Sequence, residues 1–393
     1  MKGEVAQGMK ILILNYEYPP LGAGAAPVCR DLAVGMGKQR HQVTVVTMGF
    51  KGLPEYEVQD GVEIFRMKCL RLHEHSCSPL EQLSYIHNTE RFLQTYLKTH
   101  HYDVCHTHFI VPTGPIALWI KKNYGIPYVL TAHGSDVEGH NRKLSVRSMH
   151  RALRPAWRKI VREAYAAAAP SEHLMRLMKR VYPGRRYLLI PNGLDIKKYA
   201  SAGKQKEKRI LIMGRMQEFK NVQTILKAIA RIPGEQWGEW HTDILGEGPF
   251  RKELEQMARK LGIGTRVSFR GWVDNGTPEQ ISYLKKAAVY ITASRFENCP
   301  MAVLEAAAAG CCLLMSDIEG HRQFFKNGPD SFFFQPEDAE ELAEKLENLL
   351  ALDLEEIVPE EVDISVYDNE RVTGKYVKLL EKAARDFHRK ISV

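Results

Sequence analysis

The chain has 393 residues, of which 44% are hydrophobic and 26% are charged, and its formal net charge is +8. This length accommodates two domains of ordinary size, each with its own core, and the composition is that of a globular protein. No uninterrupted run of about 18 apolar residues exists, which excludes a membrane-spanning helix. The short apolar run after Met9 predicts a strand rather than a secretory signal, because no small-residue cleavage site follows it.

The cysteines point to a reducing compartment. Their number is odd and none forms a CxxC pair, so a framework of disulfides is disfavoured and a cytoplasmic location is expected. The seven are Cys29, Cys69, Cys77, Cys105, Cys299, Cys311 and Cys312.

Apolar runs separated by helix-length segments predict two series of buried parallel strands. The first series is KILILN (10–15), HQVTVVT (41–47), YDVCHTHF (102–109), IPYVLTAHG (126–134) and YLLIPNG (187–193). After a polar stretch, SAGKQKEKR (201–209), the second series is ILIMGR (210–215), HTDILGEG (241–248), RVSFRGW (266–272), AVYITAS (288–294) and CCLLMSD (311–317).

This alternation predicts an α/β protein with two doubly wound, Rossmann-like domains that face each other across a cleft. We place the N-terminal domain at residues 1–192 and the C-terminal domain at 193–371. The final amphipathic stretch predicts a terminal helix over 372–393.

The small residues at 22–26, of sequence GAGAA, raise the possibility of a phosphate-binding loop between the first strand and a helix. A dinucleotide fingerprint needs a third glycine where this chain has Pro27, and it needs an acid after the second strand, which ends at Thr47. It also needs a tight turn, whereas six residues with two prolines precede Gly22. A dehydrogenase is therefore disfavoured. We expect backbone amides near a helix N-terminus to approach a phosphate, the alternative being a loop that only packs tightly.

Histidines gather in HHYDVCHTH (100–108) and HEHSC (73–77), a composition that admits a zinc site. However, Cys105 and His106 are neighbours on a predicted strand, as are Thr107 and His108. Adjacent strand residues point to opposite faces and cannot converge on one ion, so we expect no metal site here.

The first half of the chain is basic. Residues 1–190 carry a net charge of +11, from 26 Lys and Arg against 15 Asp and Glu, and the remainder carries −3. Between Arg142 and Arg186 lie 13 Lys and Arg and only two acids. Such asymmetry predicts an anionic partner for the first half, but no nucleic acid, because no recognition motif accompanies the charge.

One helix in this basic segment is expected to be amphipathic, with Pro155 kinking or dividing it. Its apolar positions are Met149, Leu153, Trp157, Ile160 and Ala164, and the arginines on the opposite face are Arg147, Arg151, Arg154, Arg158 and Arg162. Two interpretations stay open: a core-facing stripe with a solvated cationic back, or a peripheral contact with an anionic membrane surface or lipid-linked acceptor.

Residues 294–310, SRFENCPMAVLEAAAAG, carry the most informative pattern. Pro300 suits the first turn of a helix, which tolerates its missing N–H, so Glu297 lies in the preceding loop and Glu305 on the helix. Two carboxylates so placed suit the hydroxyls of a sugar or ribose, the alternative being a capping acid and a surface acid. Three backbone amides are expected to face a ligand, those of Met301, Ala302 and Val303.

FENCPMAVLEA resembles the E-x7-E element of family 4 glycosyltransferases, retaining enzymes of the GT-B fold. Four further blocks and a nucleotide-loop element agree in order and spacing from about Met9 to the last helix. They are the glycine loop ILNYEYPPLGAGAA, the cleft loop TAHGSD (131–136), the hinge LLIPNGLD (188–195), the basic GRMQEFKN (214–221) and DIEGHRQFF (317–325).

The resemblance implies that the terminal helix over 372–393 packs back on the first domain. It also implies a nucleotide-sugar donor held by the second domain without a metal or other cofactor. Arg215 and Lys220 would neutralise the diphosphate, with help from the loop of Gly22 and Gly24. The remaining donor-binding residues would be Asn298, Met301, Ala302 and Glu305, the last at the ribose hydroxyls.

The resemblance also implies three residues at the reacting sugar. Glu297 would hold the sugar near C3 or C4, and His133 would contact it near the anomeric carbon. Asp136 would orient His133 or touch the acceptor. Retention is expected by front-face attack, in which the leaving phosphate oxygen takes the acceptor proton, with double displacement through a carboxylate as the alternative.

Two residues depart from the family pattern: Pro300 stands where glycine is frequent, and Gln323 stands where an acid often follows the GH pair. The acceptor is expected to be a glycan or lipid-linked molecule bound to the first domain, in surface glycan, polysaccharide or glycolipid synthesis. Two other functions remain open, a nucleotide-sugar epimerase of similar fold and a non-catalytic, membrane-attached sugar-binding protein.

Overall fold

A computed structural model describes residues 8–22, 24–74, 77–140, 144–200, 206–326, 328, 331–357 and 363–391. Its internal contacts divide the chain into two units. The first comprises Met1–Gly193 and Asn369–Val393, and the second comprises Leu194–Asp368. The terminal helix α15 (Asn369–Ile391) thus belongs to the first unit.

The first unit contains an eight-stranded sheet of order β3-β4-β2-β1-β5-β6-β7-β8. Every neighbouring pair is parallel except β3 and β4, which form an antiparallel hairpin. The strands are β1 (Lys10–Leu14), β2 (Gln42–Met48), β3 (Tyr56–Gln59), β4 (Val62–Met67), β5 (Val104–His108), β6 (Tyr128–Thr131), β7 (Ala166–Ala169) and β8 (Leu188–Leu189).

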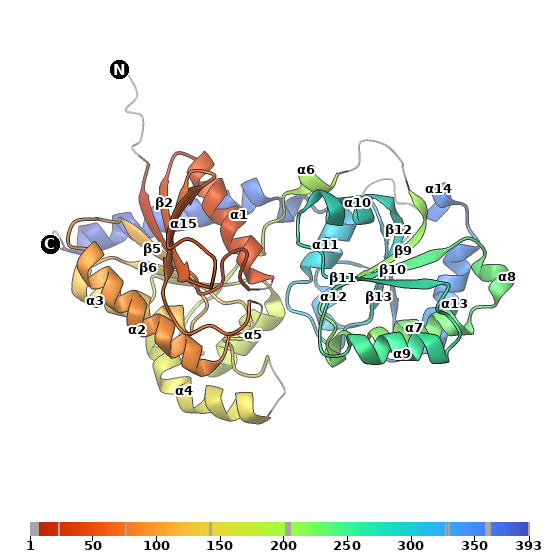
Figure 1. The fold of residues 1–393 in the computed structure, drawn as a ribbon. Helices are drawn as coiled ribbons and strands as arrows, with labels where there is room; N and C mark the ends of the chain where they lie inside the picture. The colour runs from red at the N-terminus through yellow and green to blue at the C-terminus, as the bar shows by residue number, and fades with distance from the viewer. Residues whose placement is uncertain are drawn as a thin grey trace, which may run out of the picture. The chain divides into compact units, whose positions relative to one another are not determined.

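Helices cover both faces of this sheet (Figure 1). Helices α1 and α15 contact each other on one face, whereas α2, α3 and α4 follow one another on the other. The helices are α1 (Ala25–Lys38), α2 (Pro79–Tyr96), α3 (Thr113–Tyr124), α4 (Leu144–Glu163), α5 (Glu172–Val181) and α15.

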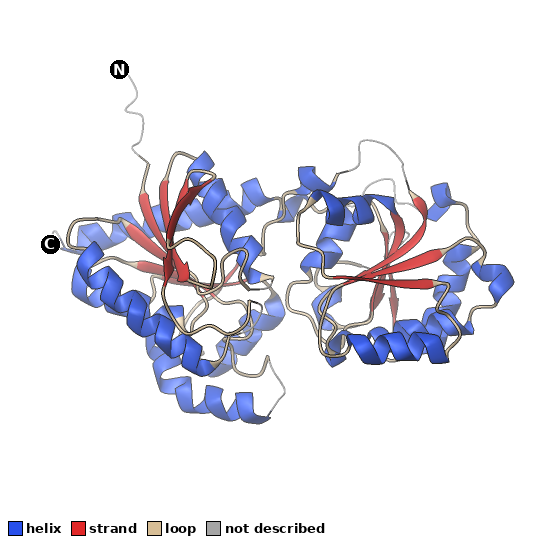
Figure 2. Cartoon of the chain, viewed as in Figure 1, coloured by secondary structure: helices blue, strands red, loops and turns tan. Residues whose placement is uncertain are grey.

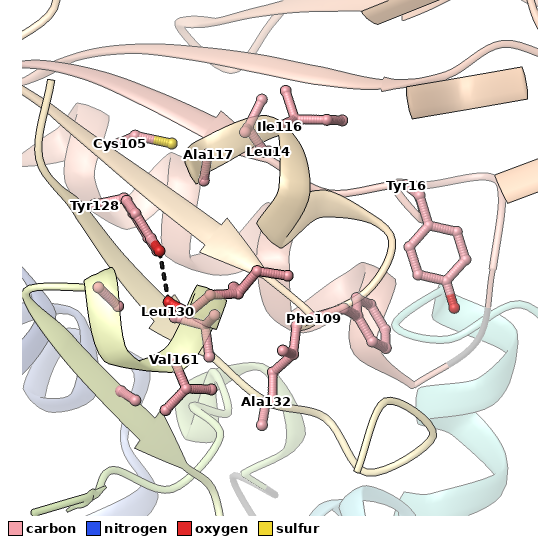
Figure 3. Close-up of a cluster of buried hydrophobic side chains, with 14 of the residues drawn as sticks. Leu14, Tyr16, Cys105, Phe109, Ile116, Ala117, Tyr128, Leu130, Ala132 and Val161 are labelled. Carbon is pink, nitrogen blue, oxygen red and sulfur yellow. Dashed lines mark hydrogen bonds between the residues drawn. The ribbon is translucent and has the colours of Figure 1, made fainter. Parts of the chain in front are cut away.

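The central strands of the first unit are apolar because both of their faces are covered. Residues 11–14 of β1 are fully buried, and Leu14 belongs to a cluster with Phe109, Tyr128 and Leu130 (Figure 3). The buried Tyr128 hydroxyl donates to the Ile160 carbonyl at 2.5 Å, so its polar atom is satisfied within the core.

The second unit contains a six-stranded, wholly parallel sheet of order β11-β10-β9-β12-β13-β14, again with helices on both faces (Figure 2). Its strands are β9 (Glu207–Met213), β10 (His241–Leu245), β11 (Val267–Gly271), β12 (Ala287–Thr292), β13 (Cys312–Ser316) and β14 (Ser331–Phe334). Its helices are α6 (Ile196–Tyr199), α7 (Val222–Arg231), α8 (Gly234–Trp237), α9 (Arg251–Lys260), α10 (Pro278–Lys286), α11 (Met301–Ala308), α12 (Glu319–Arg322), α13 (Ala339–Leu350) and α14 (Leu354–Ile357).

These two parallel-sheet units confirm the predicted α/β class. All ten predicted strands are present, with ends that differ by a few residues. Four strands were not predicted: β3, β4, β7 and β14. Of the two expectations for Pro155, a kink or a division, the division is wrong, because Pro155 lies inside the single helix α4.

Candidate functional site

In both sheets the strand order reverses at one point, between β1 and β5 in the first unit and between β9 and β12 in the second. Open α/β sheets bind ligands beyond the carboxyl ends of the strands at such a point. In the second unit a small pocket lies there. Its lining includes Gly214, Arg215, Lys220, Thr292 and Ala293.

Glycines allow the loops after β9 and β10 to meet closely beside this pocket. Gly246 has a φ of +136°, and a Cβ added to it would lie 1.9 Å from the Gly214 carbonyl oxygen. No larger residue fits without moving the backbone. The contact fixes the start of the loop that carries Arg215 and Lys220.

Lys220 and Glu297 form the ion pair at the centre of the second unit's site. The Lys220 ammonium lies 2.5 Å from Glu297 Oε1, and the Ser294 hydroxyl donates to the same oxygen at 2.8 Å. The two charged side chains are 24% and 15% exposed, so they are shielded yet within reach of a ligand.

The pKa of Glu297 lies below its ordinary value. Burial disfavours its charge, but the Lys220 ammonium, the nearby His321 ring and the hydrogen bonds from Lys220 and Ser294 outweigh that effect. Glu297 is therefore a carboxylate at neutral pH, able to accept hydrogen bonds from hydroxyl groups.

A pair of phenylalanines aligns the two loops that carry this ion pair. The rings of Phe219 and Phe296 stack with centroids 4.5 Å apart, and the Arg295 amide donates to the Phe219 carbonyl at 2.8 Å. Because each phenylalanine immediately precedes Lys220 or Glu297, the stack fixes their separation.

The N-terminus of α11 offers fewer free amides than the sequence suggested. The Met301 amide donates to the Cys299 carbonyl, and the Val303 amide donates to the Pro300 carbonyl, both at 2.9 Å. The prediction that these two amides face a ligand is therefore wrong. The Ala302 amide alone of the three has no hydrogen-bond partner in the described chain. Asn298 uses its carbonyl to accept from the Gln323 side chain at 3.0 Å.

Glu305 lies on α11 and is only 6% exposed. The Gln280 side-chain amide donates to Glu305 Oε2 at 2.8 Å, which orients the carboxylate. Gln280 is itself buried on α10. No motif in the sequence marks Gln280, because the contact joins two helices that are 25 residues apart.

Arg215 lines the pocket at the end of β9 and is partly exposed. Within the described ranges its guanidinium has neither a hydrogen bond nor an ion pair. A cation left without an internal partner, beside a second cation on the same loop, is available to an anionic ligand.

The glycine loop of the first unit follows β1 at the other switch point. Gly22 has a φ of +100°, a Cβ there would lie 2.6 Å from Glu17 Cβ, and its amide donates to the Glu74 carbonyl at 2.8 Å. Gly22 therefore serves the packing of the loop. At Gly24, the N-cap of α1, an added Cβ would meet none of the described residues within 4 Å, so tight packing against them does not explain this glycine.

Asp136 organises the loop that carries His133. Its Oδ1 accepts the amides of His133 at 3.0 Å and Gly134 at 2.8 Å, and its Oδ2 accepts the Ile110 amide at 2.7 Å. Burial raises the pKa of Asp136, and these backbone amides oppose the rise. Both oxygens are thus engaged by backbone, so Asp136 positions His133 rather than offering a free carboxylate.

His133 is half-buried and hydrogen-bonded to a second histidine, His108, which the sequence offered only as a candidate metal ligand. Its Nε2 lies 3.0 Å from His108 Nδ1, and its ring centroid is 4.6 Å from that of Phe109. Burial lowers the pKa of His133 to about 3, so the ring is neutral at physiological pH. Phe109 has a φ of +70°, an uncommon conformation for a large residue and one found at functional sites.

Among the residues with described placement, no group of three or more His, Cys, Asp or Glu is arranged to hold a metal ion. No helix of that part of the chain is both long enough and apolar enough to cross a membrane. Arg142, at the start of the predicted basic segment, and His75 of the second histidine cluster lie outside it.

Two family models match consecutive parts of the chain. Glycosyltransferase Family 4 matches residues 22–198, and Glycosyl transferases group 1 matches residues 195–363. The chain belongs to the family 4 glycosyltransferases. Both of the described site regions, around His133 and around Lys220 and Glu297, fall within these matches.

Two relatives illustrate the range of this glycosyltransferase family. An uncharacterised glycosyltransferase of Methanocaldococcus jannaschii is 27% identical over 363 residues, which are 87% of this chain and 89% of the relative. The UDP-Gal:alpha-D-GlcNAc-diphosphoundecaprenol alpha-1,3-galactosyltransferase of Escherichia coli is 25% identical, over 84% of this chain and 85% of the relative.

Solved structures share the fold of this glycosyltransferase. Sucrose-phosphate synthase from Thermosynechococcus elongatus superposes with a TM-score of 0.73 at 18% identity, over 98% of both chains. Anabaena HepE in complex with UDP has a TM-score of 0.65 at 17% identity, over 98% of this chain and 100% of that one. These neighbours are GT-B glycosyltransferases, so the predicted fold is confirmed.

Proposed function

We propose that this glycosyltransferase moves a hexosyl group from a nucleoside-diphosphate donor to an acceptor hydroxyl, with retention at the anomeric carbon and without a metal. The observation that carries this proposal is the grouping of Arg215, Lys220 and Glu297 at the switch point of the second unit. Two cations there match a diphosphate, and the carboxylate matches sugar hydroxyls.

The proposed chemistry begins with loss of the diphosphate. Negative charge grows on the leaving phosphate as the glycosidic bond breaks, and Arg215 and Lys220 neutralise it in place of a metal ion. The free amide of Ala302 adds a donor. Lys220 exchanges Glu297 for the phosphate, which frees the Glu297 carboxylate to accept hydroxyls of the sugar. Glu305, held by Gln280, accepts the ribose hydroxyls.

The acceptor oxygen attacks the anomeric carbon from the face that the diphosphate leaves. The bond from that carbon to the phosphate oxygen breaks as the new carbon–oxygen bond forms, and the acceptor proton passes to the departing phosphate oxygen. No group on the enzyme then needs to act as a base. Double displacement through a carboxylate is the alternative.

Relatives support a nucleotide-sugar donor and an amphiphilic acceptor. HepE binds UDP, and the relative from Escherichia coli is named for a galactosyl donor and a diphosphoundecaprenol acceptor. A lipid-linked or glycan acceptor on the first unit accords with the net positive charge of residues 1–190.

Helix α4 supports a membrane or lipid contact for that acceptor. Its C-terminal half is covered, with Trp157 and Ile160 at most 5% exposed, whereas Met149 and Leu153 in its N-terminal half are 38% and 36% exposed. An uncovered apolar stripe beside exposed arginines is the pattern of an interfacial helix. We expect binding to anionic vesicles that weakens with salt and with Met149→Ser plus Leu153→Ser. Unchanged vesicle binding of this double variant would mean that the exposed apolar stripe of α4 faces solvent and does not contact the membrane.

Activity is tested with a panel of nucleotide sugars in EDTA, with and without glycan and lipid acceptors. The proposal expects release of the diphosphate and, with water as acceptor, a first-formed sugar that has the anomeric configuration of the donor. An epimerase would convert the nucleotide sugar without releasing the diphosphate. A non-catalytic binding protein would leave every donor intact.

A further inference from the structure

Three histidines of the first unit, His106, His108 and His133, form a continuous row of ring contacts. His106 and His108 are two residues apart on β5, so their side chains lie on the same face of the sheet, with ring centroids 4.3 Å apart. The ring centroids of His108 and His133 are 5.2 Å apart. His106 and His108 are fully buried. The row raises the question of which ring nitrogens carry protons, since a neutral histidine has one N–H and one lone pair.

The partners of His108 answer this question. His108 Nδ1 lies 3.0 Å from His133 Nε2, whereas His108 Nε2 is buried and has no hydrogen-bond partner among the residues that the structure describes. A proton on His108 Nε2 would therefore be a buried, orphaned N–H, which is rare and costly. A proton on His108 Nδ1 instead donates to His133 Nε2, and the unpartnered nitrogen keeps only a lone pair.

His106 follows the same rule independently. Its Nε2 lies 2.9 Å from the Thr131 hydroxyl, which donates in turn to the Tyr376 hydroxyl of α15 at 3.0 Å. Its Nδ1 is buried and has no hydrogen-bond partner within the described part of the chain. His106 therefore donates from Nε2 to Thr131, and this chain of bonds passes away from His133 rather than toward it.

We propose that His108 is a positioning residue that holds His133 as the neutral Nδ1–H tautomer, so that His133 meets a ligand as a hydrogen-bond donor and not as a base. The assignment follows from His133 Nε2, which has to accept the His108 proton and therefore carries the lone pair. The proton of the neutral His133 ring then resides on Nδ1. The tautomer itself does not depend on the proposed reaction.

The consequence for chemistry does rest on the proposed function. A ligand atom that meets His133 Nδ1–H has to be an acceptor, such as a sugar oxygen or an oxygen of the leaving phosphate. His133 cannot take the acceptor's proton through Nδ1, because that nitrogen already holds one. The proton therefore has to go to another atom, as it does when the departing phosphate oxygen receives it.

NMR of the full chain labelled with ¹⁵N-histidine tests the tautomer without any ligand. The protonated and unprotonated ring nitrogens of a neutral histidine have widely separated ¹⁵N shifts, and His133→Asn identifies the signals of His133. We expect the protonated nitrogen of His133 to be Nδ1. A protonated Nε2 on His133, or a charged ring near neutral pH, would overturn the proposal.

Variants at His108 separate positioning from mere packing. The side-chain amide of His108→Asn reaches the place of Nδ1 and can still donate, so the Nδ1–H tautomer of His133 and most of kcat are expected to persist. His108→Leu removes the donor, so a mixture of tautomers and a kcat at least tenfold lower are expected, with a smaller change in the donor KM. Equal losses of kcat in both variants, with the His133 tautomer unchanged, would reduce His108 to a packing residue.

His106→Gln is the matched control, because its amide can still donate to Thr131, and the 3.0 Å hydrogen bond of the His133 ring joins it to His108 and not to position 106. We expect the His133 signals of this variant to be those of the parent chain. If no variant or parent chain transfers sugar, the NMR result still decides the tautomer, so failure of the proposed function and failure of this inference are distinguishable.

Discussion

The Lys220 ammonium lies 2.5 Å from Glu297 Oε1, so in the absence of ligand these two charged groups of the second unit's site neutralise each other. A nucleotide sugar has to separate them, because its phosphate attracts the cation and its hydroxyls attract the carboxylate. The pair therefore shields both charges until the correct ligand replaces each partner.

Replacing the carboxylate should separate diphosphate binding from sugar recognition. Glu297→Gln releases Lys220, so we expect a free nucleoside diphosphate to bind at least as tightly as it does to the parent chain. The nucleotide sugar should lose roughly 10- to 150-fold in kcat/KM, which corresponds to the ~1.5–3 kcal/mol of a hydrogen bond to a charged group. Calorimetry and initial rates measure the two effects, with the exposed Glu253→Gln as control. Parallel losses of diphosphate and sugar binding would contradict the assignment.

Gln280 should matter for the donor although it is too buried to contact solvent. Gln280→Leu removes the side-chain amide that donates a hydrogen bond to Glu305 and orients it. We therefore expect the KM for the nucleotide sugar to rise about tenfold, which corresponds to a loss of ~1.4 kcal/mol in binding free energy, and kcat to change less. Gln256→Leu on the exposed side of α9 should change neither constant. A fall in kcat alone would mean that Glu305 acts at the reacting sugar.

The two glycines of the first unit should respond differently to substitution. Gly22→Ala places a side chain at a φ of +100° against Glu17, so a loss of about 1–3 kcal/mol in the free energy of unfolding is expected. The methyl group of Gly24→Ala meets none of the described residues, so this variant should change the free energy of unfolding by less than about 0.5 kcal/mol. Gly24→Asp should instead weaken binding of the nucleotide sugar, because its carboxylate repels the diphosphate. Denaturant unfolding and donor titration check both. Tolerance of Gly22→Ala would show that the loop rearranges freely.

Stability should fall with acid through the buried histidines. Burial lowers the pKa of His106 from 6.5 to about 3, so between these values the unfolded chain binds a proton that the folded chain does not. The free energy of unfolding therefore decreases as pH falls through this window, by up to ~1.4 kcal/mol per pH unit for this residue. His106→Gln should retain about 1–2 kcal/mol more of its stability than the parent chain on going from pH 6.5 to 5. His101→Gln, exposed, should keep the parental slope, and identical slopes in all three proteins would contradict the prediction.

Much of the fold follows from local pattern. Runs such as 10–15 are apolar throughout because parallel strands are covered on both faces. The β3–β4 hairpin was overlooked although Asp60 and Gly61, at φ of +51° and +78°, form a common two-residue hairpin turn. Strand β7 was overlooked for a different reason: its four alanines favour helix locally, and burial between neighbouring strands overrides that preference.

Site residues that stand within one sequence motif were predictable. Contacts between residues that are distant in the sequence were not. Glu297 and Lys220 stand in recognisable blocks, but only the folded chain shows that Phe219 and Phe296 stack beside them. The prediction that the Met301 amide faces a ligand was wrong because, in the turn before α11, this amide donates to the Cys299 carbonyl. Such bonds depend on the backbone path, which residue identity does not determine.

The proposed mechanism depends on the second unit binding a nucleoside diphosphate through Arg215 and Lys220 without a metal. The most direct test is thermal unfolding of the full chain with UDP, GDP, ADP, CDP or dTDP, each in EDTA, repeated with Arg215→Ala and with the exposed Arg259→Ala. We predict that at least one diphosphate raises Tm in EDTA, that Arg215→Ala abolishes the rise and that Arg259→Ala preserves it. No rise with any diphosphate in a folded sample, a rise that requires a metal, or a rise that survives Arg215→Ala would contradict the claim.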